Sequence, residues 1–287
     1  EPYDPIGYRI GSFVVFPQLE LAGVAFSNVL SSPRARADRA LAMTPEIRAV
    51  TAWSWHGFEV RARGNYSFHD EFASEDDRAG LIEARGRIDI TSRTNLQAQA
   101  SREITQESRT GVDAATSQTR ADITTTAFAA SFNHRFNRLS VQLRGGVSEV
   151  DFAGVRQASV LDSNVDRNFT TAEQAARVSY ELKPTLTAFA EVAANQRDYQ
   201  APASDGIVRD STGTRVRAGL GFGSTSQVLR GEASFGWGHQ TPDDSRLARI
   251  DGYLLDIAFE IGVGCAQQCQ AIPRDHEKHP TIRTGGE

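Results

Sequence analysis

Hydrophobic and polar residues alternate strictly along much of this chain. In the stretch 58–69, apolar residues such as Phe58 and Val60 alternate with charged residues such as Glu59 and Arg61. Successive side chains of a β-strand point to opposite faces, so this stretch predicts a strand with one apolar and one polar face. It is longer than an average strand of about five or six residues, and it reaches the about nine to eleven residues that a membrane-crossing strand needs.

The alternation recurs often enough to predict about twelve strands. It is clear at 82–90, 139–148, 172–182, 186–195, 214–222, 229–238 and 253–263, and weaker at 18–28, 41–51, 94–105 and 121–136. We expect short turns near 53–56, 92–94, 137–138, 183–185 and 224–227, and longer polar loops near 30–40, 70–79, 106–120, 152–168, 197–212 and 240–250. Short connections at one end and long ones at the other are typical of outer-membrane β-barrels.

The pattern therefore predicts an all-β fold, an antiparallel up-and-down transmembrane β-barrel. The hairpins recur roughly every 40 to 46 residues, a period that overlaps β-propeller blades, but a blade needs four short strands per period instead of two long ones. We expect an N-terminal extension over 1–15, barrel hairpins over 16–263 and an irregular tail over 264–287. The chain opens at Glu1 with no Met and no apolar signal region, so we interpret it as a mature or trimmed chain that lacks its signal peptide.

One face of the predicted strands carries a dense mixture of opposite charges. These residues are the candidates for lining a lumen: Arg61, Arg63, Arg85, Arg87, Arg144, Arg177, Arg215, Arg217, Arg230, Glu59, Glu83, Glu173, Glu191 and Glu232. The opposite face carries mostly Ala, Gly, Val and Leu. A sandwich core needs bulky, interlocking side chains, whereas a lipid-facing wall needs only to be apolar. This difference favours a barrel over a soluble β-sandwich, which would also alternate.

Aromatic residues fall where two interfacial belts would need them. Those near predicted short turns are Trp53, Trp55, Phe58, Phe136 and Phe222, and those toward the predicted long loops are Tyr66, Phe68 and Trp237. Outer-membrane barrels carry such girdles at both membrane interfaces. Scattered placement of rings in an ordinary β protein is the alternative.

Composition narrows the function. Hydrophobic residues make up 39% of the chain and charged residues 23%, with a net charge of -5. The charge excludes a strongly basic nucleic-acid binder. No run of about 18 consecutive apolar residues is present, so no transmembrane helix is expected. These numbers alone favour a soluble all-β protein, and only the distribution of charge over the two faces favours a barrel.

The sequence contains no recognisable catalytic motif, and we expect no enzymatic activity and no cofactor. A nucleophile elbow, a glycine-rich phosphate loop and an HExxH motif are all missing. His69 with Ser74, and His239 with Ser245, offer the best enzyme alternative, near the long loops. The sequence Cys265-x3-Cys269 with His276-x2-His279 lies outside the usual zinc spacing, so we expect no metal, although the two cysteines could form a disulfide.

Several short motifs in order resemble a known family. They are the opening from Glu1 to Phe13, Phe16-Pro17-Gln18-Leu19-Glu20-Leu21, Arg87-Ile88-Asp89-Ile90-Thr91 with Thr94-Asn95-Leu96, the run Phe132 to Ser140, and Asn195-Gln196-Arg197-Asp198-Tyr199. Over residues 1–262 the chain resembles the putative β-barrel porin 2 family of outer-membrane proteins. The resemblance implies a bacterial outer-membrane barrel without catalytic residues, often encoded with exopolysaccharide systems. Because family members continue with further hairpins, we expect a chain truncated or frameshifted after Val263.

Two functions remain open at this point. The first is a porin-like conduit, for exopolysaccharide export or for polar solutes, with a mixed-charge lumen. The second is a structural or adhesive envelope barrel that transports nothing. The partners expected are outer-membrane lipid and lipopolysaccharide, with periplasmic polysaccharide-export proteins if the chain is an export conduit, and no nucleic acid.

Overall fold

The computed structural model describes residues 6–30, 33–107, 120–157, 160–162, 164–223 and 229–261. Its strands are β1 (Tyr8–Ile10), β2 (Phe13–Phe26), β3 (Asp38–Thr51), β4 (His56–His69), β5 (Asp77–Thr91), β6 (Thr94–Gln106), β7 (Asp122–Phe136), β8 (Leu139–Phe152), β9 (Val155–Gln157), β10 (Val160–Asp162), β11 (Phe169–Lys183), β12 (Leu186–Tyr199), β13 (Ser211–Phe222), β14 (Leu229–Pro242) and β15 (Ile250–Ile261). Two short 3-10 helices, η1 (Ala73–Glu75) and η2 (Val165–Arg167), lie in loops. No helix in these ranges is long and apolar enough to cross a membrane.

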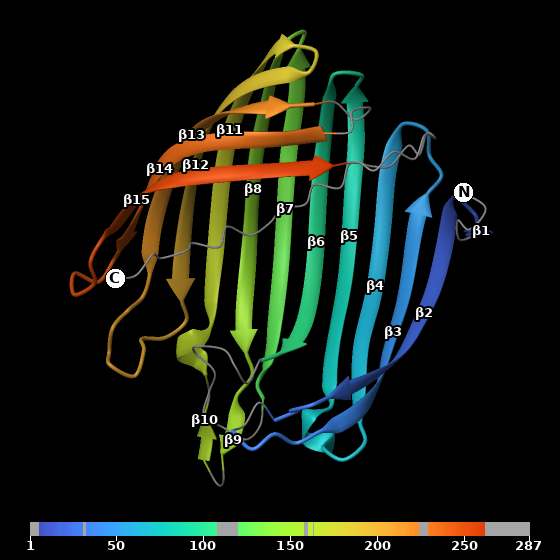
Figure 1. Cartoon of the computed structure of the whole chain (residues 1–287). Coiled ribbons are helices and arrows are strands. Elements are labelled where there is room, and N and C mark those ends of the chain that lie inside the picture. Colours follow the sequence, from blue (N-terminus) through green and yellow to red (C-terminus); the bar gives the residue numbers. More distant parts are fainter. Residues whose placement is uncertain are drawn as a thin grey trace.

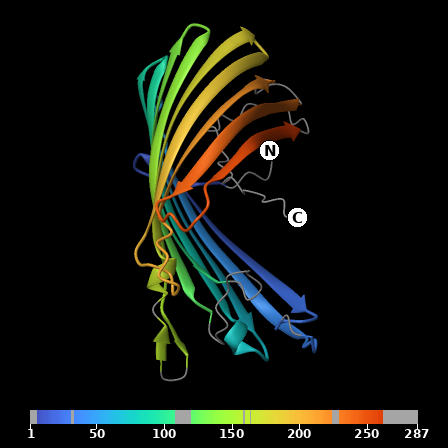
Figure 2. The same ribbon diagram turned by 90° about the vertical axis from the view of Figure 1, so that its left-hand side faces the viewer.

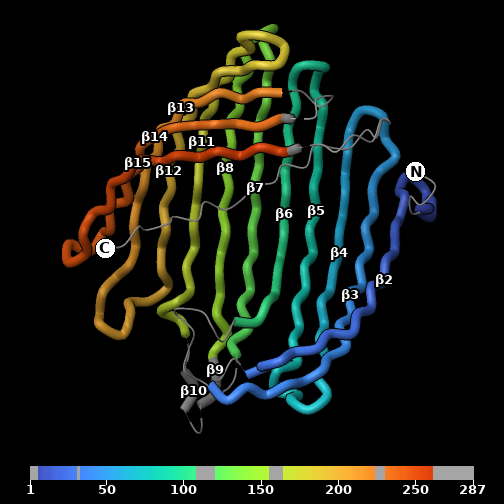
Figure 3. The backbone as a smooth tube through the Cα atoms, viewed as in Figure 1, coloured from blue at the N-terminus to red at the C-terminus, as the bar shows by residue number. Residues whose placement is uncertain are grey.

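The strands form one antiparallel up-and-down sheet. Its order, β1 to β8 followed by β11 to β15, is the order of the chain, and β9 and β10 form a separate two-stranded hairpin in a long loop. Each strand therefore lies beside its neighbour in sequence, as the backbone trace shows (Figure 1, Figure 3). The all-β up-and-down prediction is confirmed, and the main sheet of the described part holds twelve strands of 12 to 15 residues besides the short β1.

The strands extend beyond the alternating stretches, most clearly at the N-terminus. Residues 8–10 and 13–26 are paired strands, so the sheet begins within the region expected as an extension over 1–15. The extra residues at strand ends are polar or follow no alternation, which is why the pattern alone ended the strands too early. The expected tail over 264–287 and the expected turn at 224–227 lie outside the described residues.

The short connections expected near 53–56, 92–94, 137–138 and 183–185, all within the described residues, lie where the sequence placed them. Asn137 and Arg138 join β7 to β8, and Asn137 adopts φ 56, a left-handed conformation that Asn tolerates better than most residues. Two-residue connections of this kind keep neighbouring strands antiparallel and in register. The longer connections, including the one that carries β9 and β10, lie at the other ends of the strands (Figure 1).

The sheet has no packed core on its apolar side. Large apolar side chains there are widely exposed, among them Leu255 at 74%, Ile82 at 63% and Leu19 at 60%. The buried hydrophobic residues of the described ranges are Ala40, Ala121, Ala175, Phe189, Ala193 and Ala203, and no large side chain there is fully buried. A soluble sandwich would cover this face with a second layer. The apolar face of this single sheet is therefore uncovered, as expected for a surface that contacts lipid.

The sheet is strongly curved and its strands are staggered. Figure 2 shows the curvature from the side. Ser211 lies at the long-loop end of β13, yet the row of paired residues that starts there ends at Arg61, in the middle of β4. The partners on the intervening strands are, in order, Arg197, Thr171, Ser148, Ala127, Ser101 and Glu83. Such stagger is the geometric counterpart of strands that tilt around a barrel axis.

Candidate functional site

The polar face is the concave, inner face of the sheet. Arg177 on β11 reaches Glu232 on β14, with Nη2 2.5 Å from Oε2 and Nη1 3.2 Å from Oε1, although β12 and β13 lie between them. Neighbouring strands are about 4.8 Å apart, so these two strands are about 14 Å apart along the sheet. The two side chains can meet only if the face that carries them curves inward and brings their tips together.

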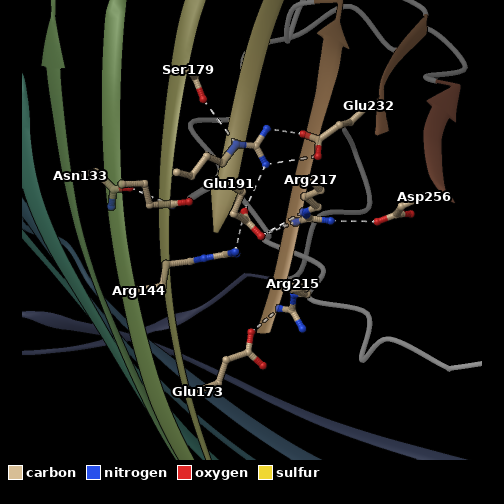
Figure 4. A network of polar contacts seen from close by, with 11 residues as sticks. Asn133, Arg144, Glu173, Ser179, Glu191, Arg215, Arg217, Glu232 and Asp256 are labelled. Carbon is tan, nitrogen blue, oxygen red and sulfur yellow. Dashed lines mark hydrogen bonds and ion pairs between the residues drawn. The ribbon is translucent and has the colours of Figure 1, made fainter. Parts of the chain in front are cut away.

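Glu191 on β12 is the centre of a charged cluster on this face (Figure 4). Its carboxylate lies 2.9 Å from Nη2 of Arg144, 3.0 Å from Nη2 of Arg217 and 4.0 Å from Nη1 of Arg177. The three arginines come from β8, β13 and β11. Only 1% of the Glu191 side chain is exposed, because the arginines cover it. The carboxylate accepts charge-assisted hydrogen bonds, which are stronger than bonds between neutral groups.

Further pairs extend the cluster across β11 to β15. Arg215 pairs with Glu173 over the intervening β12, and Arg217 also lies 3.2 Å from Asp256 on β15. The cluster thus contains Arg144, Arg177, Arg215 and Arg217 against Glu173, Glu191, Glu232 and Asp256. Four cations face four carboxylates, so the charges of the cluster balance.

Small and planar residues give the arginine side chains room. Ala175 and Ala193 are buried beside the cluster on the inner face. The guanidinium of Arg177 lies 3.6 Å from the ring centroid of Phe189, a cation–π contact that fixes its plane. A Cβ at Gly219 would come within 2.7 Å of that ring, so the glycine lets the ring lie against the backbone of β13.

A row of amides continues the polar face toward the N-terminal strands. Asn133 donates to Asn95 over 3.1 Å, and Gln142 donates to Asn133 over 2.9 Å. The register aligns Asn95, Asn133, Gln142 and Arg177 on consecutive strands β6, β7, β8 and β11. Amides and paired charges thus lie next to one another on the inner face, from β6 to β15.

The N-terminal strands carry their own ion pairs. These are Arg61 with Glu46 at 2.8 Å, Arg48 with Glu59 at 3.9 Å, Arg85 with Glu83, and Arg87 with Asp89 at 2.8 Å. Nε of Arg63 is buried without a hydrogen-bond partner among the described residues. Arg230 pairs with Glu260 at 2.7 Å near the short-turn end of the last two strands. Each predicted cation except Arg63 thus has a carboxylate partner within the described part of the chain.

The structure unites only some of the residues that the sequence predicted for the lumen. Seven of them form the cluster around Glu191: Arg144, Arg177, Arg215, Arg217, Glu173, Glu191 and Glu232. Other residues of these polar contacts were not among the predicted ones: Glu46, Arg48, Asp89, Asn95, Asn133, Gln142, Asp256 and Glu260. The alternation at 41–51 and 253–263 places Glu46, Arg48 and Asp256 on the polar face, so the same pattern could have found these three.

The predicted belt residues lie near both ends of the strands. Trp53 and Trp55, 51% and 67% exposed, occupy the turn between β3 and β4. Phe58, Phe136 and Phe222 lie near short turns, whereas Tyr66, Phe68 and Trp237 lie on the outer face nearer the long loops. Trp237 is paired with Val216 and Tyr253, and Tyr253 is an exposed aromatic that the sequence analysis did not select. That these rings form interfacial belts remains a prediction.

Ser74 and His69, one of the two pairs named as an enzyme alternative, make contacts with other residues. Ser74 donates to Glu75 rather than to a histidine, over 3.2 Å. His69 lies beside Asp76 at 3.6 Å and against the ring of Phe26. These contacts tie the loop between β4 and β5 to the sheet. They do not assemble a nucleophile with a base.

A curved up-and-down sheet with an apolar exterior and an ion-paired interior defines the wall of an outer-membrane β-barrel. The model of the family described as "Putative beta-barrel porin 2" matches residues 1–259, and the chain belongs to this family. The resemblance inferred from the sequence motifs is thereby confirmed. The predicted location in the outer membrane is confirmed as well, because the family consists of porin barrels.

Solved structures with a similar course of the chain are outer-membrane proteins. OmpT of Vibrio cholerae folded in vitro, in its trimer form, has a TM-score of 0.40 and 10% identity, covering 86% of this chain and 97% of that one. OmpT expressed in the outer membrane has a TM-score of 0.42 and 11% identity, covering 82% and 90%. These similarities are too weak to bear on function. Comparison with curated proteins found no match.

Proposed function

We propose that this chain forms the wall of an outer-membrane channel that passes polar solutes, saccharides of an exported polysaccharide among them, along its inner face. The observation that carries the proposal is the charge-balanced surface around Glu191, flanked by the amides of Asn95, Asn133 and Gln142. Paired charges and amides can exchange hydrogen bonds with hydroxyl groups without strongly favouring one sign of ion.

The balance of charge sets the expected selectivity. An excess of lumen arginines would attract acidic sugars, but four carboxylates oppose the four arginines of the cluster. We therefore favour neutral or weakly charged saccharides as the solute class. Periplasmic polysaccharide-export proteins would be the partners that deliver such a solute.

Channel recordings test this proposal directly. We expect the reconstituted full chain to conduct in planar bilayers with weak ion selectivity, and its liposomes to swell in neutral oligosaccharides. Glu191→Gln removes one negative charge from the inner face, so the reversal potential should shift toward anion selectivity, while Glu260→Gln at the short-turn end should shift it less. A silent bilayer together with liposomes that do not swell would contradict a channel.

A structural envelope barrel is the second candidate, and the density of the cluster favours it. Arginines that reach across one or two strands partly fill the inner face and could seal it. Deleting the gene separates the two functions. Loss of surface polysaccharide with build-up inside the cell would support export, whereas unchanged polysaccharide would support the structural role.

A further inference from the structure

The outer face changes from apolar to polar near the long-loop end of the middle strands. Arg102 on β6 and Glu149 on β8 both point outward, in register with Ile82 on β5 and Thr126 on β7. Arg102 lies four residues before Gln106, at which β6 ends. The distance between the two residues along the strand is about 13 Å. An arginine at this height can extend its guanidinium to the membrane interface while its stem stays in the apolar layer.

A shallow groove lies beside this arginine. Its volume is ≈ 520 Å³, and its lining includes Arg102, Thr126 and Glu149 together with the apolar Ile82, Phe128 and Val147. Phe128 and Val147 lie two residues from Thr126 and Glu149 on the same strands, toward the short-turn end. The groove is therefore polar toward the long loops and apolar toward the short turns. A molecule with a charged head and hydrocarbon chains matches this division.

The charge of the groove indicates the head group. Farther toward the loops Arg78 is already paired with Asp122 at 2.7 Å, and Gln106 joins the same pair. Arg102 has no ion pair or hydrogen bond to any residue that the structure describes, and it is exposed on the outer face. A guanidinium can bind a phosphate through two parallel hydrogen bonds. The long loops of outer-membrane barrels face the cell exterior, so the lipid layer at this height is the outer leaflet.

We infer that this groove, lined by Arg102, Thr126, Phe128, Val147 and Glu149, binds the phosphorylated saccharide head and acyl chains of a lipid A molecule in the outer leaflet. Arg102 holds a phosphate, and the apolar part of the groove packs against an acyl chain. Glu149 lies two strands away, where a divalent cation can link its carboxylate to the second phosphate. The inference rests on the outer-membrane setting and not on passage of solutes along the inner face.

Native mass spectrometry of the full chain in detergent, with bisphosphorylated lipid A added, tests the site. We expect wild type to retain lipid A, Arg102→Gln to bind it about tenfold more weakly, and Arg102→Lys to fall between them. Arg138→Gln, which removes an exposed arginine at the opposite end of the sheet, is the matched control and should bind as wild type does. Inorganic phosphate at millimolar concentration should not displace the lipid. This experiment measures lipid binding and not conductance, so its result can be interpreted even if the protein forms no open channel.

Three outcomes would overturn the inference. The first is equal lipid A retention by wild type and Arg102→Gln. The second is equal retention of phosphatidylethanolamine and lipid A, which would mean a nonspecific apolar surface. The third is that Arg102→Gln and Glu149→Gln lower the melting temperature equally with no change in lipid A binding, which would mean that the two residues serve only the stability of the sheet. Circular dichroism of each variant confirms that the sheet has formed.

Discussion

At the scale of single residues, Glu191 is the side chain on which most of the inner-face charge depends. One carboxylate faces three guanidinium groups and is almost completely covered by them. Removing one partner of a buried ion pair leaves the other charge without compensation, which costs more than the intact pair contributes. Exposed pairs such as Arg230 with Glu260 are screened by water and contribute little.

Glu191→Gln should therefore destabilise the folded sheet by about 3–5 kcal/mol. Glu260→Gln, which breaks an exposed pair, should change the free energy of unfolding by about 0–1 kcal/mol. Urea titration of the protein refolded in vesicles, followed by tryptophan fluorescence, measures both. Equal effects of the two substitutions would mean that Glu191 is not the structural centre of the cluster.

A second residue-scale prediction concerns the loop between β14 and β15. The Arg246 guanidinium, which donates to the Asp244 carboxylate, holds the pKa of that carboxyl well below its ordinary value. Since the folded-state pKa is lowered, the contact is fully present above the ordinary pKa of Asp, about 3.9, and is lost only as the pH falls through the lower folded value. Arg246 also donates to the Gly206 carbonyl over 2.7 Å, so its release frees two loops.

We expect the carboxyl carbon of Asp244 to titrate well below the ordinary pKa of Asp, about 3.9, in an NMR pH series. In Arg246→Gln its midpoint should rise toward about 3.9. An unchanged midpoint in the variant would show that Arg246 does not set this pKa.

At the scale of elements, alternation predicted the strands and their two faces, because a strand that separates lipid from a polar interior must alternate along its whole crossing. The weakest stretches, such as 121–136, became full strands because both neighbours pair with them along their length. Alternation could not predict which charged residues form ion pairs with one another. Arg177 meets Glu232 only because curvature shortens the path across two strands, and curvature is a property of the assembled sheet.

Adjacent positions on β8 test the assignment of the faces. Leu143 is 49% exposed on the outer face, and Gln142 faces inward opposite Arg177. Leu143→Glu places a carboxylate in the lipid and removes an apolar group, which should cost about 2–4 kcal/mol. Gln142→Glu introduces the same group on the other face beside a cation and should cost less than about 1 kcal/mol.

The free energies of unfolding of these two variants in vesicles give the comparison. A reversed order, with Gln142→Glu the more damaging, would mean that the polar face is the side exposed to lipid. Equal losses would mean that neither face contacts hydrocarbon. Either result would remove the basis for a channel.

At the scale of the whole molecule, the described sheet has two edges, β2 with the short β1 along its start, and β15. β2 runs from the short-turn end to the long-loop end, and β15 runs the opposite way. An even number of long strands thus leaves the two edges antiparallel, the sense in which bacterial barrels close. Unpaired backbone groups cost several kcal/mol each in hydrocarbon, so open edges are not expected in a membrane.

Hydrogen exchange of the protein in vesicles tests closure. The amides of β15 that point away from β14 should be as protected as those that point toward it. The corresponding amides of β14, which are paired on both sides, provide the reference. Fast exchange confined to the outward amides of β15 would mean that this edge stays open.

Because the spatial order of the strands is the order of the chain, the backbone of each described strand of the main sheet pairs only with the strands before and after it in the sheet. Duplicating or deleting one hairpin would leave the pairing of the others intact and would change only the circumference. A lineage of such proteins can thus acquire wider or narrower bores by gaining or losing a single repeat, without redesigning the rest of the wall.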